Sequence, residues 1–271
     1  MTATACSLSL GVGFYMGSGS SHRAPASTPA VRKTEIKLEL SPSDLPRLLE
    51  ALELSKKEKS KPRERRIYFF DTPTLELYRS GIILRARLES DSDGDSTVKV
   101  RTPEEQLGRF AEFEDTKGFK CEWDQAVFRS PENSGKLHCS LSKDQSALAF
   151  AHGLVARDRP LSSLYTSKQL DFLNQSASLP IAWENLKILG PVQSTTWESE
   201  ESSFGRALTV ELWEIAGSGV RILELSLKVD SEESSDDSQK ILRWIHERGL
   251  KPLDSGRSKT QWVLERLTVS P

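Results

Sequence analysis

Residues 35–40, near the start of the chain, alternate strictly between charged and apolar side chains. Because successive side chains of a β-strand point to opposite faces, this segment predicts a strand with one charged face and one apolar face. The charged face carries Glu35, Lys37 and Glu39. For one strand taken alone, a charged face turned to solvent is the ordinary interpretation.

The same alternation, or a run of β-branched and aromatic residues, returns along the chain. It predicts further strands over 66–70, 82–88, 97–101, 120–124, 208–214, 221–229 and 262–267, and a short one over 110–115. Two successive strands carry only basic residues on the charged face: Arg85, Arg87, Lys99 and Arg101. Other strands carry acids at corresponding positions: Glu122, Asp124, Glu211 and Glu224.

Helical spacing of apolar residues predicts helices between these strands. One begins at Ser41-Pro42, an N-cap followed by a first-turn proline, and another follows the acidic run 230–237 and ends at Gly249. A short helix or turn is expected over 75–78. Weaker helical patterns cover 145–155 and 163–173, and 187–192 resembles a passage from helix to strand.

The sorting of the charged faces by sign suggests that they do not simply face solvent. A solvent face usually mixes polar residue types, whereas here one strand pair is purely basic and other strands are rich in acids. The predicted helices are available to cover the apolar faces. We therefore predict an α+β fold, a closed antiparallel barrel with a charged lumen and helices packed outside.

Composition limits the function classes. The 271 residues carry a formal net charge of -2, so no overall positive field favours nucleic acid, and no apolar run is long enough for a membrane span. Residues 1–33 are rich in Ser, Ala, Gly and Thr and contain no acid. We expect a disordered tail there, in preference to an organellar targeting peptide, followed by a single domain over 34–271.

The cysteine usage bears on the cellular compartment of the protein. Cys6, Cys121 and Cys139 show no metal-binding or redox spacing, and their odd number argues against a disulfide framework. Cys121 falls on the apolar face of its strand, which predicts a small buried side chain. An intracellular, most simply cytoplasmic, reducing environment fits this usage.

Basic and acidic side chains that share one lumen have a chemical use. Arg forks match phosphate oxygens and Lys supplies point charge, so converging basic residues favour an anion. Carboxylates beside them suit hard divalent cations, Mg²⁺ or Mn²⁺. The combination predicts a small phosphorylated substrate and phosphoryl-transfer or phosphoanhydride chemistry.

The order of these motifs resembles the CYTH superfamily, the triphosphate tunnel metalloenzymes. The resemblance rests on the charged opening strand, the segments 68–72, 84–87 and 98–101, and then 121–124 and 224–228. It implies an eight-stranded antiparallel tunnel. The opening strand reads E-x-K-x-E where that family usually has E-x-E-x-K, and the late acidic pair is here Glu224-x-Ser226.

The resemblance also implies roles for individual residues. The implied substrate-binding residues are Lys37, Arg85, Arg87, Lys99, Arg101, Lys228 and Lys259. The implied metal ligands are Glu35, Glu39, Asp124, Glu211 and Glu224. The implied catalytic residues are Glu35, Lys37 and Glu122; the two glutamates would bind or orient the metal and the attacking water, and Lys37 would assist the grip on the phosphate chain.

Three functions agree with this reading. The first is a divalent-metal-dependent hydrolase of an inorganic or organic triphosphate. The second is a lyase or cyclase that expels pyrophosphate from an organic phosphate ester. The third is a polyphosphate- or nucleotide-binding module without catalysis. The sequence indicates neither the substrate nor the oligomeric state.

Overall fold

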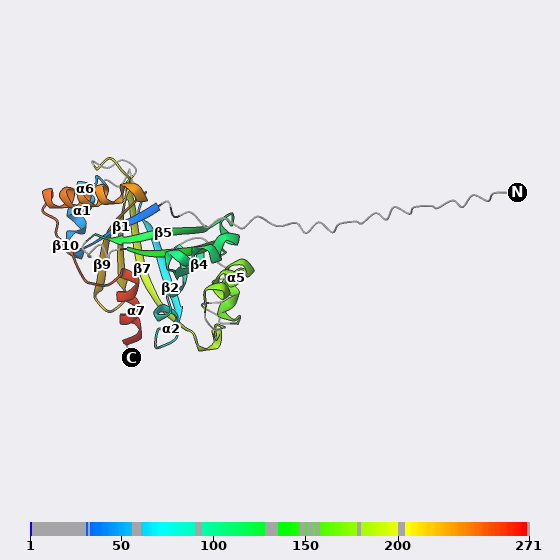
Figure 1. Ribbon diagram of the computed structural model, residues 1–271. Helices are drawn as coiled ribbons and strands as arrows, with labels where there is room; N and C mark the ends of the chain where they lie inside the picture. The colour runs from blue at the N-terminus through cyan, green and yellow to red at the C-terminus, as the bar shows by residue number, and fades with distance from the viewer. Residues whose placement is uncertain are drawn as a thin grey trace.

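A ten-stranded sheet forms the body of the molecule and closes on itself as a barrel (Figure 1). The computed structural model describes residues 1, 31, 33–55, 61–89, 94–127, 135–146, 150, 154, 158–177, 180–199 and 204–269. The barrel strands are β1 (Lys33–Leu40), β2 (Arg63–Asp71), β3 (Ile82–Glu89), β4 (Gly94–Arg101), β5 (Phe119–Ala126), β6 (Gly135–Gln145), β7 (Lys187–Ser199), β8 (Leu208–Ile215) and β9 (Val220–Asp230). The two-residue β10 (Pro252–Leu253) adds to β1.

Nine of these strands close the barrel in the order β1-β5-β6-β4-β3-β2-β7-β8-β9, and β9 returns to β1. All neighbours are antiparallel except β1 and β5, which pair in parallel. The barrel is therefore mixed and nine-stranded among the described residues, which corrects the prediction of eight antiparallel strands. Alternation reveals the faces of a strand but not its direction, so the parallel pair could not be seen in the sequence.

The apolar strand faces point outward and lie under helices, as predicted. On one side α1 (Leu45–Ala51) and α6 (Ser234–Glu247) cover the apolar residues of β1, β8 and β9. On another side α5 (Ser167–Ser176) and a 3-10 helix (Glu104–Phe113) cover β3, β4 and β6. Figure 1 shows α6 and α5 on different sides of the barrel.

Short elements complete the described chain. The predicted helix near 75–78 is α2 (Glu76–Arg79), and the pattern at 163–173 becomes α5. The single turns of 3-10 helix are Pro42–Asp44, Leu161–Leu164, Trp183–Asn185 and Ser231–Glu233. Of the predicted helix 145–155, Gln145 ends β6 and most of the remainder lies outside the described residues.

Three predicted elements are wrong. The segment 110–115 lies largely in the 3-10 helix, where Phe110 and Phe113 are three residues apart and both buried. The last predicted strand, 262–267, is part of α7 (Lys259–Val269), whose Val263 and Leu264 are adjacent and both buried. Adjacent buried residues fit a helix packed on one face, not a half-exposed strand. The segment 187–192 belongs wholly to β7.

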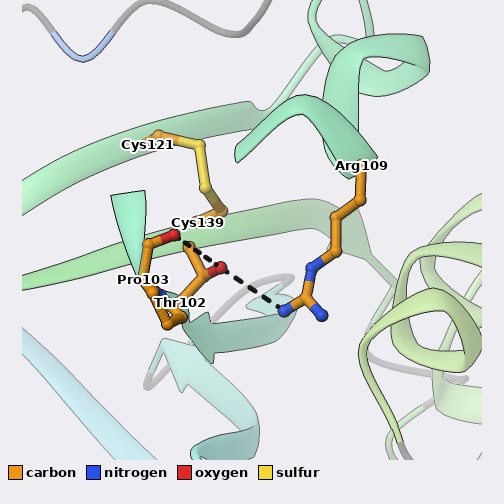
Figure 2. The surroundings of a disulfide bond; sticks show 5 residues. All are labelled: Thr102, Pro103, Arg109, Cys121 and Cys139. Carbon is orange, nitrogen blue, oxygen red and sulfur yellow. Dashed lines mark hydrogen bonds between the residues drawn. A yellow bond between two sulfur atoms is a disulfide. The ribbon is translucent and has the colours of Figure 1, made fainter. Parts of the chain in front are cut away.

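A disulfide joins Cys121 to Cys139, although the odd cysteine count argued against a disulfide (Figure 2). The two residues lie directly opposite each other on β5 and β6, with a Cα–Cα distance of 4.0 Å. A count of cysteines ignores strand pairing, which here brings two of the three together. Beside the bond, Arg109 donates to the Thr102 hydroxyl.

Among the described residues, no helix is long and apolar enough to cross a membrane. The predicted tail, 1–33, lies almost entirely outside the described residues. The tail, the single domain over 34–271 and the intracellular location all stay predictions.

Candidate functional site

The charged strand faces line the inside of the barrel. Two cavities of about 250 and about 140 Å³ lie there and share lining residues, among them Lys37, Lys99 and Lys259. We call the two cavities together the lumen. Counted over the described part of the chain, its lining contains ten Lys and Arg residues and seven Asp and Glu residues, an excess of three positive charges with histidine neutral. An anion is the ligand that such a lining favours.

Arg85 carries much of this uncompensated charge. It projects from β3 into the larger cavity, where its Nε is buried and has no hydrogen-bond partner among the described residues. Burial, together with repulsion from Arg87, lowers the Arg85 pKa to about 10. Arg87 differs, because its Nε lies 2.8 Å from an oxygen of Asp95. A buried guanidinium without a carboxylate partner is costly unless an anion neutralises it.

Arg101 lines the smaller cavity and is held by an aromatic residue. Its guanidinium donates to the Tyr78 hydroxyl at 2.7 Å and lies 4.4 Å from the centre of the same ring. The Arg101 Nε is also buried without a hydrogen-bond partner in the described part of the chain. The four predicted phosphate-gripping residues thus face the lumen, divided between its two cavities.

An alternating chain of charges crosses the middle of the lumen. Lys37 Nζ lies 3.0 Å from both Glu35 and Asp124, and Lys99 Nζ lies 2.8 Å from Asp124. Burial opposes the charge of Asp124, yet Lys37 and Lys99 hold its pKa well below the usual value. Burial lowers the pKa of Lys99, whereas Asp124 and Glu35 outweigh burial at Lys37 and raise its pKa well above the usual value.

The chain of charges also depresses the pKa of Glu35. Burial would raise this pKa, but Lys37 and, more weakly, Lys228 outweigh it. A carboxylate with a depressed pKa is a weak base and a good hydrogen-bond acceptor. Glu35 is therefore suited to orienting a water molecule more than to removing its proton.

His138 lies beside Asp124 and was not among the predicted site residues. Its side chain is 7% exposed, and its Nδ1 lies 3.1 Å from Asp124 without hydrogen-bond alignment. Burial and the nearby charge of Lys99 lower the His138 pKa to about 3, although Asp124 opposes them. The imidazole is thus neutral near pH 7. The sequence does contain a pattern that could have indicated His138, because residues 137–141 alternate between apolar and polar side chains, as in a β-strand.

Glu122 lines the larger cavity. Its carboxylate pairs with Lys228 at 3.1 Å and with Lys120, a residue that we did not predict for the site. The Lys228 side chain is 49% exposed, so it is more accessible than Lys37 or Lys99. Burial opposes the charge of Lys228, but Glu122 prevails and raises its pKa.

Three further carboxylates form a row across adjacent strands. Strand register places Glu39 of β1 opposite Glu224 of β9, and Glu224 opposite Glu211 of β8. We call these three residues the acid row. Lys259 pairs with Glu211 and lies 2.8 Å from Glu224. Burial opposes the charge of Glu211, but Lys259 lowers its pKa to about 2.

These contacts do not fit a resident divalent metal. Each predicted ligand except Glu39 is already in an ion pair with a lysine, and Glu39 accepts a hydrogen bond from Ser255 at 2.6 Å. Among the described residues, no group of three or more His, Cys, Asp or Glu is arranged to hold a metal ion. A divalent ion needs several oxygen ligands that are not already engaged by cations.

The fold is shared with solved structures. A candidate adenylyl cyclase from Hippeastrum with a dominant triphosphatase activity matches with a TM-score of 0.58 and 17% identity over 89% of this chain and 98% of that chain. A candidate adenylate cyclase from Bacillus halodurans matches with a TM-score of 0.55 and 15% identity over 86% and 97%. No protein-family model and no curated protein matches the sequence. At these identities the matches show a shared fold, and the predicted likeness is borne out at that level alone.

Proposed function

We propose that the lumen binds a triphosphate and that the protein hydrolyses its terminal phosphoanhydride bond. The observation that carries this proposal is the buried Arg85 guanidinium, whose Nε has no hydrogen-bond partner among the described residues, in a lining with excess positive charge. A polyanion would supply the missing acceptors. The fold of a protein with a dominant triphosphatase activity supports the choice of reaction.

In the proposed reaction, Arg85 and Arg87 grip phosphate oxygens from β3, and Lys99 supplies a point charge from β4. Water attacks the terminal phosphorus, the bond from that phosphorus to the bridging oxygen breaks, and the shortened polyphosphate leaves with the bond's electron pair. Basic residues stabilise the charge that develops on the leaving group. Glu35 and Glu122 orient the water, and the proton that it loses passes to bulk water.

In this proposal Mg²⁺ or Mn²⁺ acts together with the substrate and is not held by the protein alone. Because the carboxylates of the lumen are engaged by lysines and Ser255, we assign the metal no resident site. A divalent ion would enter as part of the substrate, bound to the oxygens of the triphosphate.

Binding without catalysis is the second candidate, and one observation favours it. Asp124 and Glu211, two of the predicted metal ligands, have pKa values held low by paired lysines. Such carboxylates are weak bases, so the lumen could retain a polyphosphate without activating water. The excess positive charge of the lumen would favour polyphosphate binding with or without hydrolysis.

A substrate panel distinguishes the candidates. The full chain is incubated with tripolyphosphate, thiamine triphosphate and ATP, each with Mg²⁺ or Mn²⁺, while phosphate and pyrophosphate release are followed separately. Hydrolysis predicts phosphate release that is lost in Arg85→Gln and retained in Arg79→Gln, a control on an exposed position of α2. Pyrophosphate release without phosphate would instead indicate the lyase. Tight binding without turnover would leave the binding module.

A further inference from the structure

The acid row requires a cation. Glu39, Glu224 and Glu211 lie opposite one another on three adjacent strands, whose backbones are about 4.8 Å apart. Like charges placed directly opposite on a sheet repel each other and destabilise it. The side chains of Glu224 and Glu211 are 14% and 24% exposed, so water screens this repulsion only in part.

The end of the chain supplies that cation. Lys259, the first residue of α7, contacts both Glu211 and Glu224 with a side chain that is 10% exposed. Burial disfavours its charge, but the two carboxylates outweigh burial and raise the Lys259 pKa. Four residues earlier, the Ser255 hydroxyl donates to Glu39. One C-terminal segment thus contacts all three members of the acid row.

Packing fixes Lys259 in this place. Val263 and Leu264 of α7 are 0% and 2% exposed and belong to an apolar cluster with Trp213 and Ile222, whose side chains also line the lumen. The Lys259 ammonium lies 4.5 Å from the centre of the Trp213 ring. The cation is therefore delivered by a packed helix, not by a free surface side chain.

We infer that Lys259 is a tethered cation that stands between Glu211 and Glu224 in the place of a divalent metal, so that docking of α7 and metal binding at this pair exclude each other. A divalent ion would have to use the same carboxylate oxygens that the ammonium engages. Lysine is suited to this place because its ammonium is a compact point charge. The inference concerns the protein without substrate and does not depend on hydrolysis.

The test measures metal binding with no phosphate compound present. The full chain is stripped of metals and titrated with Mn²⁺, with free Mn²⁺ followed by electron paramagnetic resonance and thermal unfolding recorded in parallel. Lys259→Met keeps most of the apolar stem and removes the charge. Lys187→Met, at an exposed position of β7, is the matched control. Glu211→Gln combined with Lys259→Met tests whether any new binding uses the acid row.

We expect the wild type and Lys187→Met to show no Glu211-dependent Mn²⁺ binding. Lys259→Met should bind Mn²⁺ about a hundredfold more tightly or better, because a unit charge a few ångströms away has been removed. Its lowered unfolding temperature should rise again with Mn²⁺, and both effects should vanish in the double variant. If Lys259→Met folds only when refolded with Mn²⁺, and does so only with Glu211 present, the inference is equally supported.

Two results would overturn the inference. One is Mn²⁺ binding to the wild type that Glu211→Gln abolishes, since metal and ammonium would then coexist. The other is a Lys259→Met variant that gains no Glu211-dependent Mn²⁺ binding, whether folded alone or refolded with the metal. Neither result bears on triphosphate hydrolysis, which is measured separately through Arg85→Gln.

Discussion

His138 should make the protein lose stability in mild acid. In the folded state its pKa is lowered to about 3, whereas an unfolded histidine titrates near pH 6.5. Unfolding below about pH 6.5 therefore takes up a proton, so this stability is fully present above the unfolded pKa and is lost as the pH falls toward the folded value. Each pH unit within that window is worth about 1.4 kcal/mol.

Between about pH 7.5 and pH 5.0 the loss through His138 amounts to about 2 kcal/mol. The depressed pKa values of Asp124 and Glu211 act on stability mainly at lower pH, because an unfolded carboxyl titrates near pH 4. The window above pH 5 therefore isolates the histidine.

The assay is urea unfolding of the wild type and of His138→Gln at several pH values in this range. The free energy of unfolding of His138→Gln should fall by about 2 kcal/mol less than that of the wild type as the pH is lowered. His246→Gln, at an exposed position of α6, is the control and should follow the wild type. Parallel curves for the wild type and His138→Gln would show that the imidazole is not held neutral, and the reasoning would fail.

Three further predictions concern the barrel and its charges. Phe172→Ala should lower the free energy of unfolding by about 3–5 kcal/mol in urea titrations, because this ring on the buried face of α5 is 0% exposed, and a smaller loss would mean that α5 is not packed against the barrel. Cys139→Ala should cost about 3 kcal/mol more under non-reducing than under reducing conditions, because only the oxidised wild type has the disulfide, which closes a loop across a sequence separation of 18. An equal loss under both conditions would argue against the bond. Asp124→Asn should cost about 3–5 kcal/mol in urea unfolding, because Lys37 and Lys99 lose a shared buried partner, and an unchanged stability would contradict their pairing.

The lining of the lumen could be predicted from the sequence because charged residues recur there at every second position, which is the period of a β-strand. In residues 35–40 the charged positions turn inward and the apolar positions Ile36, Leu38 and Leu40 pack under helices. The opposite signs on different strands were enough to indicate that they meet. Their placement in one lumen follows directly from a period of two.

Other features depend on partners that a local pattern does not contain. The parallel pairing of β1 with β5 joins segments far apart in the chain, and nothing within either segment reveals its direction. The strand β6 alternates with neutral polar residues, including His138 and Ser140, so it lacked the charge signal that marked the other strands. The sequence placed Lys259 among the predicted substrate-binding residues. Its ion pairs with Glu211 and Glu224 depend on the docking of α7, which no local pattern reveals.

We propose that Arg85 gives the lumen its affinity for a triphosphate, and calorimetric titration with tripolyphosphate tests this claim. Wild-type protein and Arg79→Gln should bind with equal affinity, and the affinity should fall as salt is added. Arg85→Gln should bind about tenfold to a hundredfold more weakly, in keeping with the loss of a charge-assisted contact. Equal binding by Arg85→Gln and Arg79→Gln would contradict the claim.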